Sequence, residues 1–361
     1  MLLHTLQVQH MRRNFNMSKQ LIVVTGATGF IASHIIAQLL QQGHQVRATV
    51  RSLAKVELVK GMLTQAGIHN FDQLSFIEAD LTTDTNWDQV MAGADYVMSV
   101  ASSTPTGEFA DADAMTQTAV NGNIRVLTHA RDAGVKRVVL TSAYGAVGMG
   151  HTNRTTPFTE KDWTNLDNPH LDPYQRSKTL AEHAAWNFIE TEGNGLEMAA
   201  INPVGVMGPV LASDFSHSNQ QIVQLLSGDV PAVPNINSGY IDVRDVASLH
   251  LLAMTSPKAN GERFLATTGE TLSMLDVANI LRDAFPQFAA KLPTTVIPDD
   301  VLKANAKTNP MLKMMATLVG NFADTSNEKA QTLLNWHPRS AKEAIIATAQ
   351  SMIDLGIVTL A

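Results

Sequence analysis

The sequence contains no cysteine. Disulfide bonds, thiolate metal sites and cysteine nucleophiles are therefore excluded, and the absence suits a cytoplasmic protein. Twelve histidines are present, but they form no His-Glu-x-x-His motif and no His-x-His pair. Because zinc sites usually combine several closely spaced ligands of these types, we expect no metal site.

Long apolar runs are also absent, since no stretch approaches the roughly 18 apolar residues that a membrane-spanning helix requires. Residues 1–18 lack the continuous apolar region of a secretory signal, and we expect them to form an N-terminal tail outside the fold. The net charge of -7 comes without any block of basic residues, which disfavours nucleic acid or an anionic membrane as the main partner. These features together predict a cytoplasmic protein.

From Leu21 onward, short β-branched runs alternate with segments of helical periodicity. The expected strands are Leu21–Val24, Gln45–Val50, Leu74–Ala79, Tyr96–Val100, Arg137–Thr141 and Met198–Ile201. The expected helices between them are Gly29–Gln42, Leu53–Ala66, Asp84–Met91, Ala112–Ala133 and Asp172–Glu190. Apolar strands separated by helices indicate a parallel sheet covered on both faces. The sequence therefore predicts a doubly wound α/β fold of the Rossmann type.

The composition changes beyond Asn202, where proline, glycine, serine and asparagine become more frequent and the alternation less regular. We therefore predict a nucleotide-binding domain over residues 19–202, to which residues 236–255 return. Residues 203–235 and 256–361 are expected to form a smaller C-terminal substrate-binding lobe.

The first expected strand leads into the loop TGATGFIA, residues 25–32. Gly26 permits a tight turn, Gly29 lets the backbone approach a pyrophosphate, and Ala32 allows close packing of helix on strand. Glycines gather in any tight turn, but these lie between a strand and a helix whose N-terminus attracts phosphate. The residues expected to contact a dinucleotide here are Gly26, Thr28, Gly29, Phe30 and Ile31.

The end of the second expected strand favours NADP(H) over NAD(H). An NAD site usually offers an acidic residue about 20 residues after the glycines, to bind the ribose 2′-hydroxyl. This chain instead has Arg51, followed by Lys55, and no carboxylate before Glu57. A guanidinium group suits a 2′-phosphate, although two solvated basic residues are the alternative interpretation. After the third expected strand, Asp80 and Leu81 are placed to meet the adenine.

Tyr174 and Lys178 lie four residues apart, on one face of an expected helix that begins at Asp172-Pro173. An ammonium group beside a phenol stabilises the phenolate, which suits the phenol to proton transfer near neutral pH. The spacing also arises by chance, but here it follows the glycine loop at a suitable distance. Tyr240 and Arg244 repeat the spacing, but arginine does not deprotonate and is the weaker partner.

On these motifs the chain resembles the extended short-chain dehydrogenases/reductases, particularly dihydroflavonol reductases, cinnamoyl-CoA reductases and related microbial aldehyde/ketone reductases. The matching segments span Leu21 to about Ser340 and are TGATGFIASHI, VRATVRS, EADLT, VASSTP, RVVLTSAYGAV, SKTLAEHAAWNF, INPVGVMGP, YIDVRDVA and NWHPRS. The resemblance implies hydride transfer from NADPH, with Arg51 and Lys55 at the 2′-phosphate. It also implies cofactor contacts from Val100, Ala101, Ser102 and Pro203.

One position departs from the pattern of these relatives. They place a serine third in a Thr-Ser-Ser run, where its hydroxyl polarises the substrate carbonyl, but this chain has Thr141-Ser142-Ala143. Either Ser142 takes the role through a shift of the loop, or a backbone N–H or a water does, or the chain has weak activity or is an engineered variant; we select Ser142. A missing donor costs on the order of 2.7–4 kcal/mol of transition-state stabilisation.

The function expected from the sequence is an NADPH-dependent reductase of aldehydes or ketones, with a small-molecule carbonyl substrate. The residues expected near that substrate are Tyr144, Met149, Met207 and Leu211, although methionine and leucine there are more often core residues. The alternatives are an NAD-dependent nucleotide-sugar epimerase or dehydratase, and an NADP-binding protein without catalysis, which Ala143 keeps open. A monomer and a homodimer are both compatible with the sequence.

Overall fold

A seven-stranded parallel sheet forms the centre of the protein. The computed structural model describes residues 19–102, 111–151, 154–213, 217–306, 316, 318–320 and 324–360. The strands of the sheet are β1 (Leu21–Val24), β2 (Gln45–Val50), β3 (Leu74–Glu78), β4 (Tyr96–Ser99), β5 (Arg137–Thr141), β6 (Glu197–Pro203) and β10 (Glu262–Ala266). Their order is β10-β6-β5-β4-β1-β2-β3, and every neighbouring pair is parallel. The predicted doubly wound parallel sheet is confirmed.

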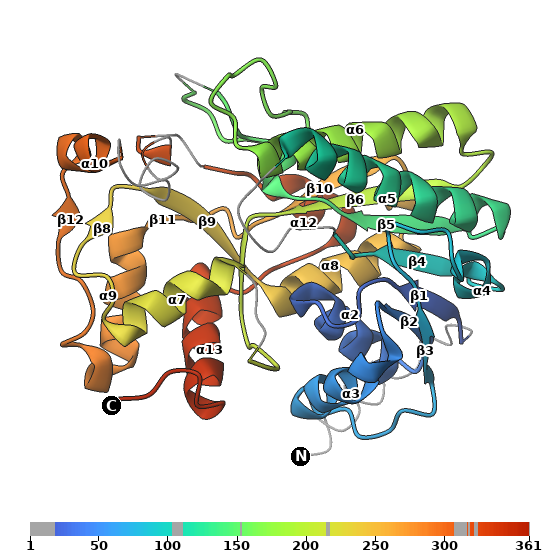
Figure 1. Ribbon diagram of the computed structural model, residues 1–361, viewed down its shortest axis with the longest axis horizontal. Coiled ribbons are helices and arrows are strands. Elements are labelled where there is room, and N and C mark those ends of the chain that lie inside the picture. The colour runs from blue at the N-terminus through green and yellow to red at the C-terminus, as the bar shows by residue number, and fades with distance from the viewer. Residues whose placement is uncertain are drawn as a thin grey trace, which may run out of the picture.

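Helices cover both faces of this sheet because alternate apolar residues of each strand point to opposite faces. Ile22 and Val24 belong to a core shared with α2 (Phe30–Gln41), α3 (Val56–Gln65) and α8 (Val243–Thr255). Val23 belongs to the opposite core. The helices of that core are α4 (Trp87–Met91), α5 (Ala112–Asp132) and α6 (Pro173–Glu192). Figure 1 shows α5 and α6 on one side of the sheet and α2, α3 and α8 on the other.

Helix α6 begins where the sequence predicts. The side chain of Asp172 accepts a hydrogen bond from the backbone N–H of Tyr174 at 2.8 Å, and Pro173 occupies the first helical position. Proline fits there because the N–H that it lacks would have no partner within the helix. This cap fixes where Tyr174 lies relative to the helix start.

A second lobe is built on smaller sheets. One sheet contains β7 (Gly205–Met207), β9 (Asn237–Asp242) and β11 (Thr271–Ser273), and another pairs β8 (Val233–Pro234) with β12 (Val296–Ile297). The helices in this part of the chain are α7 (His217–Ser227), α9 (Met274–Ala284), α10 (Asp299–Asn305) and α13 (Ala341–Asp354). Met207, Ile222, Leu281 and Ile345 share its apolar core. Figure 1 shows α7, α9 and α13 gathered at one end of the molecule.

Short elements complete the described chain: η1 (Leu53–Lys55), η2 (Tyr144–Ala146), η3 (Pro257–Ala259), η4 (Pro286–Phe288) and α12 (Glu328–Leu334). Within the described residues, no helix is both long and apolar enough to cross a membrane.

Two features of the predicted lobe are wrong. Part of the range 256–361 belongs to the central domain and not to the lobe. β10 pairs with β6 at the edge of the central sheet, and α12 packs on β10. Residues 236–255 return to that sheet only as α8, whereas β9 joins β7 and β11. Phe264 and Leu265 of β10 are fully buried, so the sheet gains apolar contact from a strand that follows a long excursion of the chain. The other predicted boundaries stay predictions.

Candidate active site

The candidate site lies where the winding of the sheet reverses. β1 stands between β4 and β2, and the chain proceeds outward from β1 in both directions. In open α/β sheets, ligands bind outside the carboxyl ends of the strands at such a point. The loops that follow β1, β4 and β5 lie at this edge of the sheet, and they contain predicted site residues that include Gly26, Ala101 and Ser142.

The glycine loop after β1 is held against the end of β4. Thr25 is fully buried, and its hydroxyl accepts hydrogen bonds of 2.9 Å from the backbone N–H groups of Val100 and Ala101. Gly26 has φ +71°, and a Cβ added to it would lie 3.0 Å from Cα and Cβ of Ala101. Both the backbone conformation and the space therefore require glycine at this position.

The second glycine stands at the start of α2. A Cβ on Gly29 would lie 3.1 Å from the carbonyl oxygen of Gly26, so a side chain there would crowd the loop. Gly29 is exposed, Thr28, Phe30 and Ile31 are half-buried, and Ala32 is fully buried against the sheet. The first turn of a helix has N–H groups without intrahelical acceptors, so this exposed backbone suits an anion.

The predicted adenine-side residues follow β2 and β3, which are neighbours in the sheet. Arg51 directly follows β2, Lys55 ends η1, and both are exposed. Hydrogen bonds from the hydroxyl and backbone N–H of Thr82 hold the pKa of Asp80 below its usual value, and the nearby charge of Arg51 lowers this pKa further. Arg51 and Asp80 thus follow two paired strands, at the edge where the sequence places the adenosine half of a dinucleotide.

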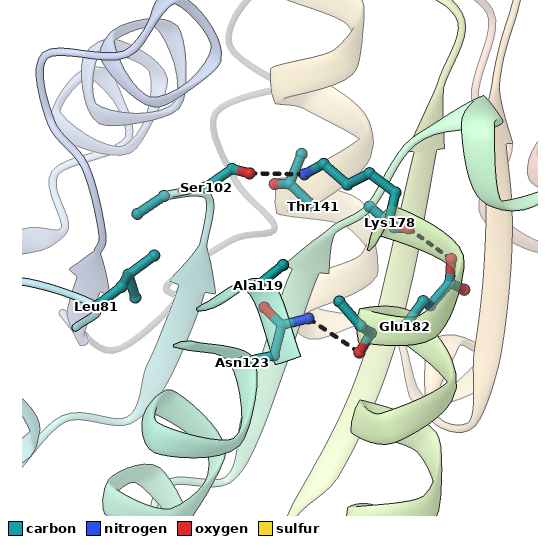
Figure 2. Close-up of a pocket in the computed structure, with 10 residues that line it drawn as sticks. Leu81, Ser102, Ala119, Asn123, Thr141, Lys178 and Glu182 are labelled. Carbon is teal, nitrogen blue, oxygen red and sulfur yellow. Dashed lines mark hydrogen bonds between the residues drawn. The ribbon is translucent and has the colours of Figure 1, made fainter. Parts of the chain in front are cut away.

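Lys178 links the predicted catalytic helix to the end of β4. Its ammonium group lies 5.8 Å from the ring centroid of Tyr174 and donates a 2.9 Å hydrogen bond to the hydroxyl of Ser102. Figure 2 shows Lys178 reaching from its helix toward Ser102. Tyr174 is half-buried. The structure thus brings together the predicted phenol, the predicted ammonium group and one predicted cofactor residue.

Lys178 and Ser102 line a small pocket of about 20 Å³ that opens to solvent. Its predicted lining residues are Leu81, Ala101, Ser102, Ser142 and Lys178. Its other lining residues are Ala119, Asn123, Thr141, Ala181 and Glu182, which the sequence analysis did not select. The sequence could have indicated Glu182 as a site residue, because it lies four residues after Lys178 and therefore on the same helix face.

Ser142, the predicted carbonyl-polarising residue, is buried, and its hydroxyl donates a 2.5 Å hydrogen bond to Oε2 of Glu182. The preceding hydroxyl, on Thr141, lies 2.8 Å from Nε2 of His250. The other ring nitrogen of His250 donates to the Val246 carbonyl, so Nε2 is the acceptor for Thr141. Each of these two hydroxyls therefore donates its hydrogen bond to a buried partner.

Other predicted residues lie away from this pocket. Pro203 is buried at the end of β6, beside Ala266 of β10. Met207 is fully buried in the core of the second lobe, and Tyr144 packs edge-on against Phe158, so both serve packing in this structure.

The rival pair Tyr240 and Arg244 is separated by its own contacts. The Tyr240 hydroxyl accepts a hydrogen bond from Gln221, while Arg244 forms an ion pair with Asp242. These two side chains therefore do not form a phenol–cation pair. Among the described residues, no group of three or more histidine, aspartate or glutamate side chains is arranged to hold a metal ion.

Comparisons with known proteins identify similar chains. A model of the NAD dependent epimerase/dehydratase family matches residues 22–266. Cinnamoyl-CoA reductase 2 of Arabidopsis thaliana is 35% identical over 305 residues, which cover 81% of this chain and 83% of that protein. The structure of yeast methylglyoxal/isovaleraldehyde reductase Gre2 complexed with NADPH superposes with a TM-score of 0.77 at 29% identity, covering 94% of this chain and 100% of that chain. Gre2 from Candida albicans in complex with NADPH gives a TM-score of 0.76 at 27% identity, over 93% of this chain and 99% of that chain.

Proposed function

This chain belongs to the NAD dependent epimerase/dehydratase family, and on that premise we propose that it is an NADPH-dependent reductase that transfers a hydride to an aldehyde or ketone carbonyl, with Tyr174 as proton donor. The observation that carries the proposal is the position of Lys178, which lines the pocket at the end of β4 and holds its ammonium group 5.8 Å from the ring centroid of Tyr174. The similarity to Cinnamoyl-CoA reductase 2 of Arabidopsis thaliana and to the two Gre2 structures complexed with NADPH supports it.

The residues of the chain fit a dinucleotide cofactor. A Cβ on Gly26 or Gly29 would lie 3.0–3.1 Å from atoms of the loop itself or of Ala101, so both positions suit only glycine. Gly29 is exposed at the start of α2, where the backbone can approach a pyrophosphate. Arg51 and Lys55 would hold the 2′-phosphate, and Ala101, Ser102 and Lys178 would border the nicotinamide ribose. When bound, NADPH supplies the hydride.

The chain's own residues supply the proton and the orientation. Tyr174 donates its phenolic proton to the carbonyl oxygen of the substrate as negative charge develops there. The ammonium group of Lys178, held 5.8 Å from the phenol ring centroid, stabilises the phenolate that remains. Ser102 accepts a hydrogen bond from the same ammonium group and so fixes its position at the pocket.

Ser142 stays a prediction as the group that polarises the carbonyl. A serine hydroxyl donates one hydrogen bond, and here the Ser142 hydroxyl donates it to Oε2 of Glu182 at 2.5 Å. Direct polarisation by Ser142 therefore requires its hydroxyl to leave Glu182. The neighbouring Ala143 has no hydroxyl, so the family position for this role is occupied by a methyl group.

The test of this function is turnover. Purified protein is mixed with NADPH, or separately with NADH, and a panel of aldehydes and ketones, and absorbance is followed at 340 nm. We expect NADPH consumption faster than that of NADH, and a loss of about 10²–10⁴-fold in kcat for Tyr174→Phe. Tyr96→Phe is the matched control, because Tyr96 begins β4 at the opposite end of the strand from the site.

Two results would refute the reductase, and a third would refute the role of Tyr174 alone. No turnover of any carbonyl despite measurable NADPH binding would favour a non-catalytic NADP-binding protein. Tightly retained NAD with no net oxidation would favour the epimerase alternative. Activity of Tyr174→Phe equal to that of Tyr96→Phe would remove Tyr174 as the proton donor while leaving the reductase in place.

A further inference from the structure

A buried carboxylate continues the row formed by the two catalytic side chains on α6. Tyr174, Lys178 and Glu182 are spaced by four residues, so they lie along one face of the helix. The Glu182 side chain has no exposed surface. Trp186, one turn further on, donates a 3.2 Å hydrogen bond from Nε1 to its Oε1. Glu182 therefore extends the catalytic face of α6 into the protein interior.

Glu182 joins α6 to three neighbouring strands of the central sheet. Its Oε2 accepts hydrogen bonds from Ser142 Oγ at 2.5 Å, at the end of β5, and from Asn202 Nδ2 at 2.7 Å, in β6. Arg263 of β10 donates from Nε to Oε1 at 2.6 Å and from Nη2 to Oε2 at 3.3 Å. Figure 2 shows Glu182 one turn beyond Lys178 on the same helix.

One of these partners, Asn202, lies beside two positions that the proposed reaction uses. Asn202 Nδ2 also donates a 3.3 Å hydrogen bond to the Ala143 carbonyl, and the next residue along β6 is Pro203. Both partners of this amide nitrogen are acceptors, which fixes the orientation of the Asn202 side chain. The loop expected to face the substrate carbonyl and the residue expected beside the nicotinamide are thus tied to the helix that carries Tyr174.

We propose that Glu182 is a positioning residue for hydride transfer, which sets the placement of Tyr174 and Lys178 relative to the ends of β5 and β6. Only an ionised carboxylate accepts from all four surrounding donor side chains without offering a proton of its own. Catalysis is sensitive to such placement, because a displacement of about 1 Å at reacting atoms costs on the order of 10²-fold in rate. This inference rests on the proposed function.

Arg263 keeps other partners when Glu182 changes. Its guanidinium group donates to the carbonyls of Glu160 and Asp162, and it stacks 3.6 Å from the ring centroid of Trp163. A neutral, isosteric Glu182→Gln variant therefore leaves the arginine held in place. However, the amide nitrogen of glutamine would face donors where an oxygen now accepts. The Glu182→Gln variant is therefore expected to fold, with the face of α6 that carries Tyr174 and Lys178 displaced.

The experiment compares Glu182→Gln with Glu190→Gln, which removes an exposed carboxylate from the same helix. Melting temperature, NADPH dissociation constant, kcat and KM are measured for each. We expect Glu182→Gln to lower kcat about 10- to 100-fold while the NADPH dissociation constant changes by less than about threefold. Glu190→Gln is expected to match the wild type in all four.

A double-mutant cycle separates positioning from direct catalysis by Ser142. If Ser142 acts through Glu182, the kcat of the double variant Ser142→Ala, Glu182→Gln equals that of Glu182→Gln alone. The Ser142→Thr variant, which keeps a hydroxyl, then retains the activity that Ser142→Ala loses. Additive losses would instead show that Ser142 acts on the substrate independently, which overturns this assignment of the pair. Should Glu182→Gln not fold, Arg263→Lys takes its place in the same cycle.

Failure of the inference differs from failure of the proposed function. An active wild type whose kcat survives Glu182→Gln within twofold would overturn the positioning role alone. A wild type that turns over no carbonyl with NADPH would overturn the reductase, and it would do so before any variant is made.

Discussion

Replacing Gly26 with alanine is expected to destabilise the protein and weaken NADPH binding, because two constraints meet at this residue. Its φ of +71° lies in the left-handed region, and an added Cβ would stand 3.0 Å from Cα and Cβ of Ala101. Gly134, after the end of α5, offers a matched control. It has φ +72°, but nothing lies within 4 Å of an added Cβ. The two substitutions share the backbone strain and differ in the steric overlap.

The magnitude follows from the two terms. A left-handed conformation costs an L-residue roughly 1–2 kcal/mol, and this cost applies to both variants. Overpacking against a close neighbour adds about 1–3 kcal/mol, which applies to Gly26→Ala alone. With an unfolding entropy of about 2.1 cal/mol/K per residue, a 361-residue chain that melts as one unit converts that difference into roughly 1–4 °C.

The assay is thermal unfolding of both variants beside the wild type, followed by titration with NADPH. Gly134→Ala is expected to melt slightly lower than the wild type and to bind NADPH unchanged. Gly26→Ala is expected to melt lower still and to lose affinity, because Ala101, one of the expected cofactor contacts, must shift. Equal melting temperatures and equal NADPH affinities for the two variants would refute the reasoning.

Three further predictions concern cofactor choice, pH and the missing hydroxyl. Arg51→Ala should raise the KM for NADPH about 10-fold through loss of a charge-assisted hydrogen bond, and leave the KM for NADH unchanged, whereas Lys60→Gln should alter neither. Burial lowers the pKa of His250 from 6.5 to about 4, so the unfolded chain binds this proton first. Thermal stability should therefore fall as pH drops from 6.5 toward 4, by up to ~3 kcal/mol from this group, and less steeply in His250→Gln. Ala143→Ser should raise kcat about 10- to 100-fold by supplying a donor to the carbonyl oxygen.

Each of these has a contrary outcome. An Arg51→Ala protein with unchanged preference for NADPH would place the 2′-phosphate elsewhere. Parallel stability curves for the wild type and His250→Gln between pH 6.5 and 4 would show that this buried imidazole does not govern acid sensitivity. An unchanged kcat in Ala143→Ser would mean that another group already polarises the carbonyl.

The central sheet could be predicted because each of its first strands is a local apolar run with a helix after it. β1, β2 and β5 have the predicted bounds, and the predicted glycine loop adopts the expected tight turn at Gly26. β10 could not be found in this way. The chain leaves the sheet after β6 and forms β7, α7, β8 and β9 of the second lobe, and then α8, before it returns as β10. Nothing local in Glu262–Ala266 specifies which sheet the strand joins.

The features of the site also divide into those that local sequence determines and those that tertiary packing determines. The amino-acid sequence by itself determined the paired Tyr174 and Lys178, because a helix places residues four apart on one face. It equally determined the glycine loop, because only glycine combines a positive φ with close backbone approach. These are short-range consequences of backbone geometry, and they suffice to indicate the reaction class.

Only the tertiary structure decided which partners the polar side chains take. Ser142 and Glu182 are 40 residues apart in sequence, and Glu182 and Arg263 are 81 apart, yet they form one buried hydrogen-bonded cluster. Such contacts arise when sheet and helix pack together and every buried polar group must find a partner. A serine that the sequence offers as a catalytic donor is thereby directed to a buried carboxylate, because that pairing depends on how α6 lies against β5, β6 and β10.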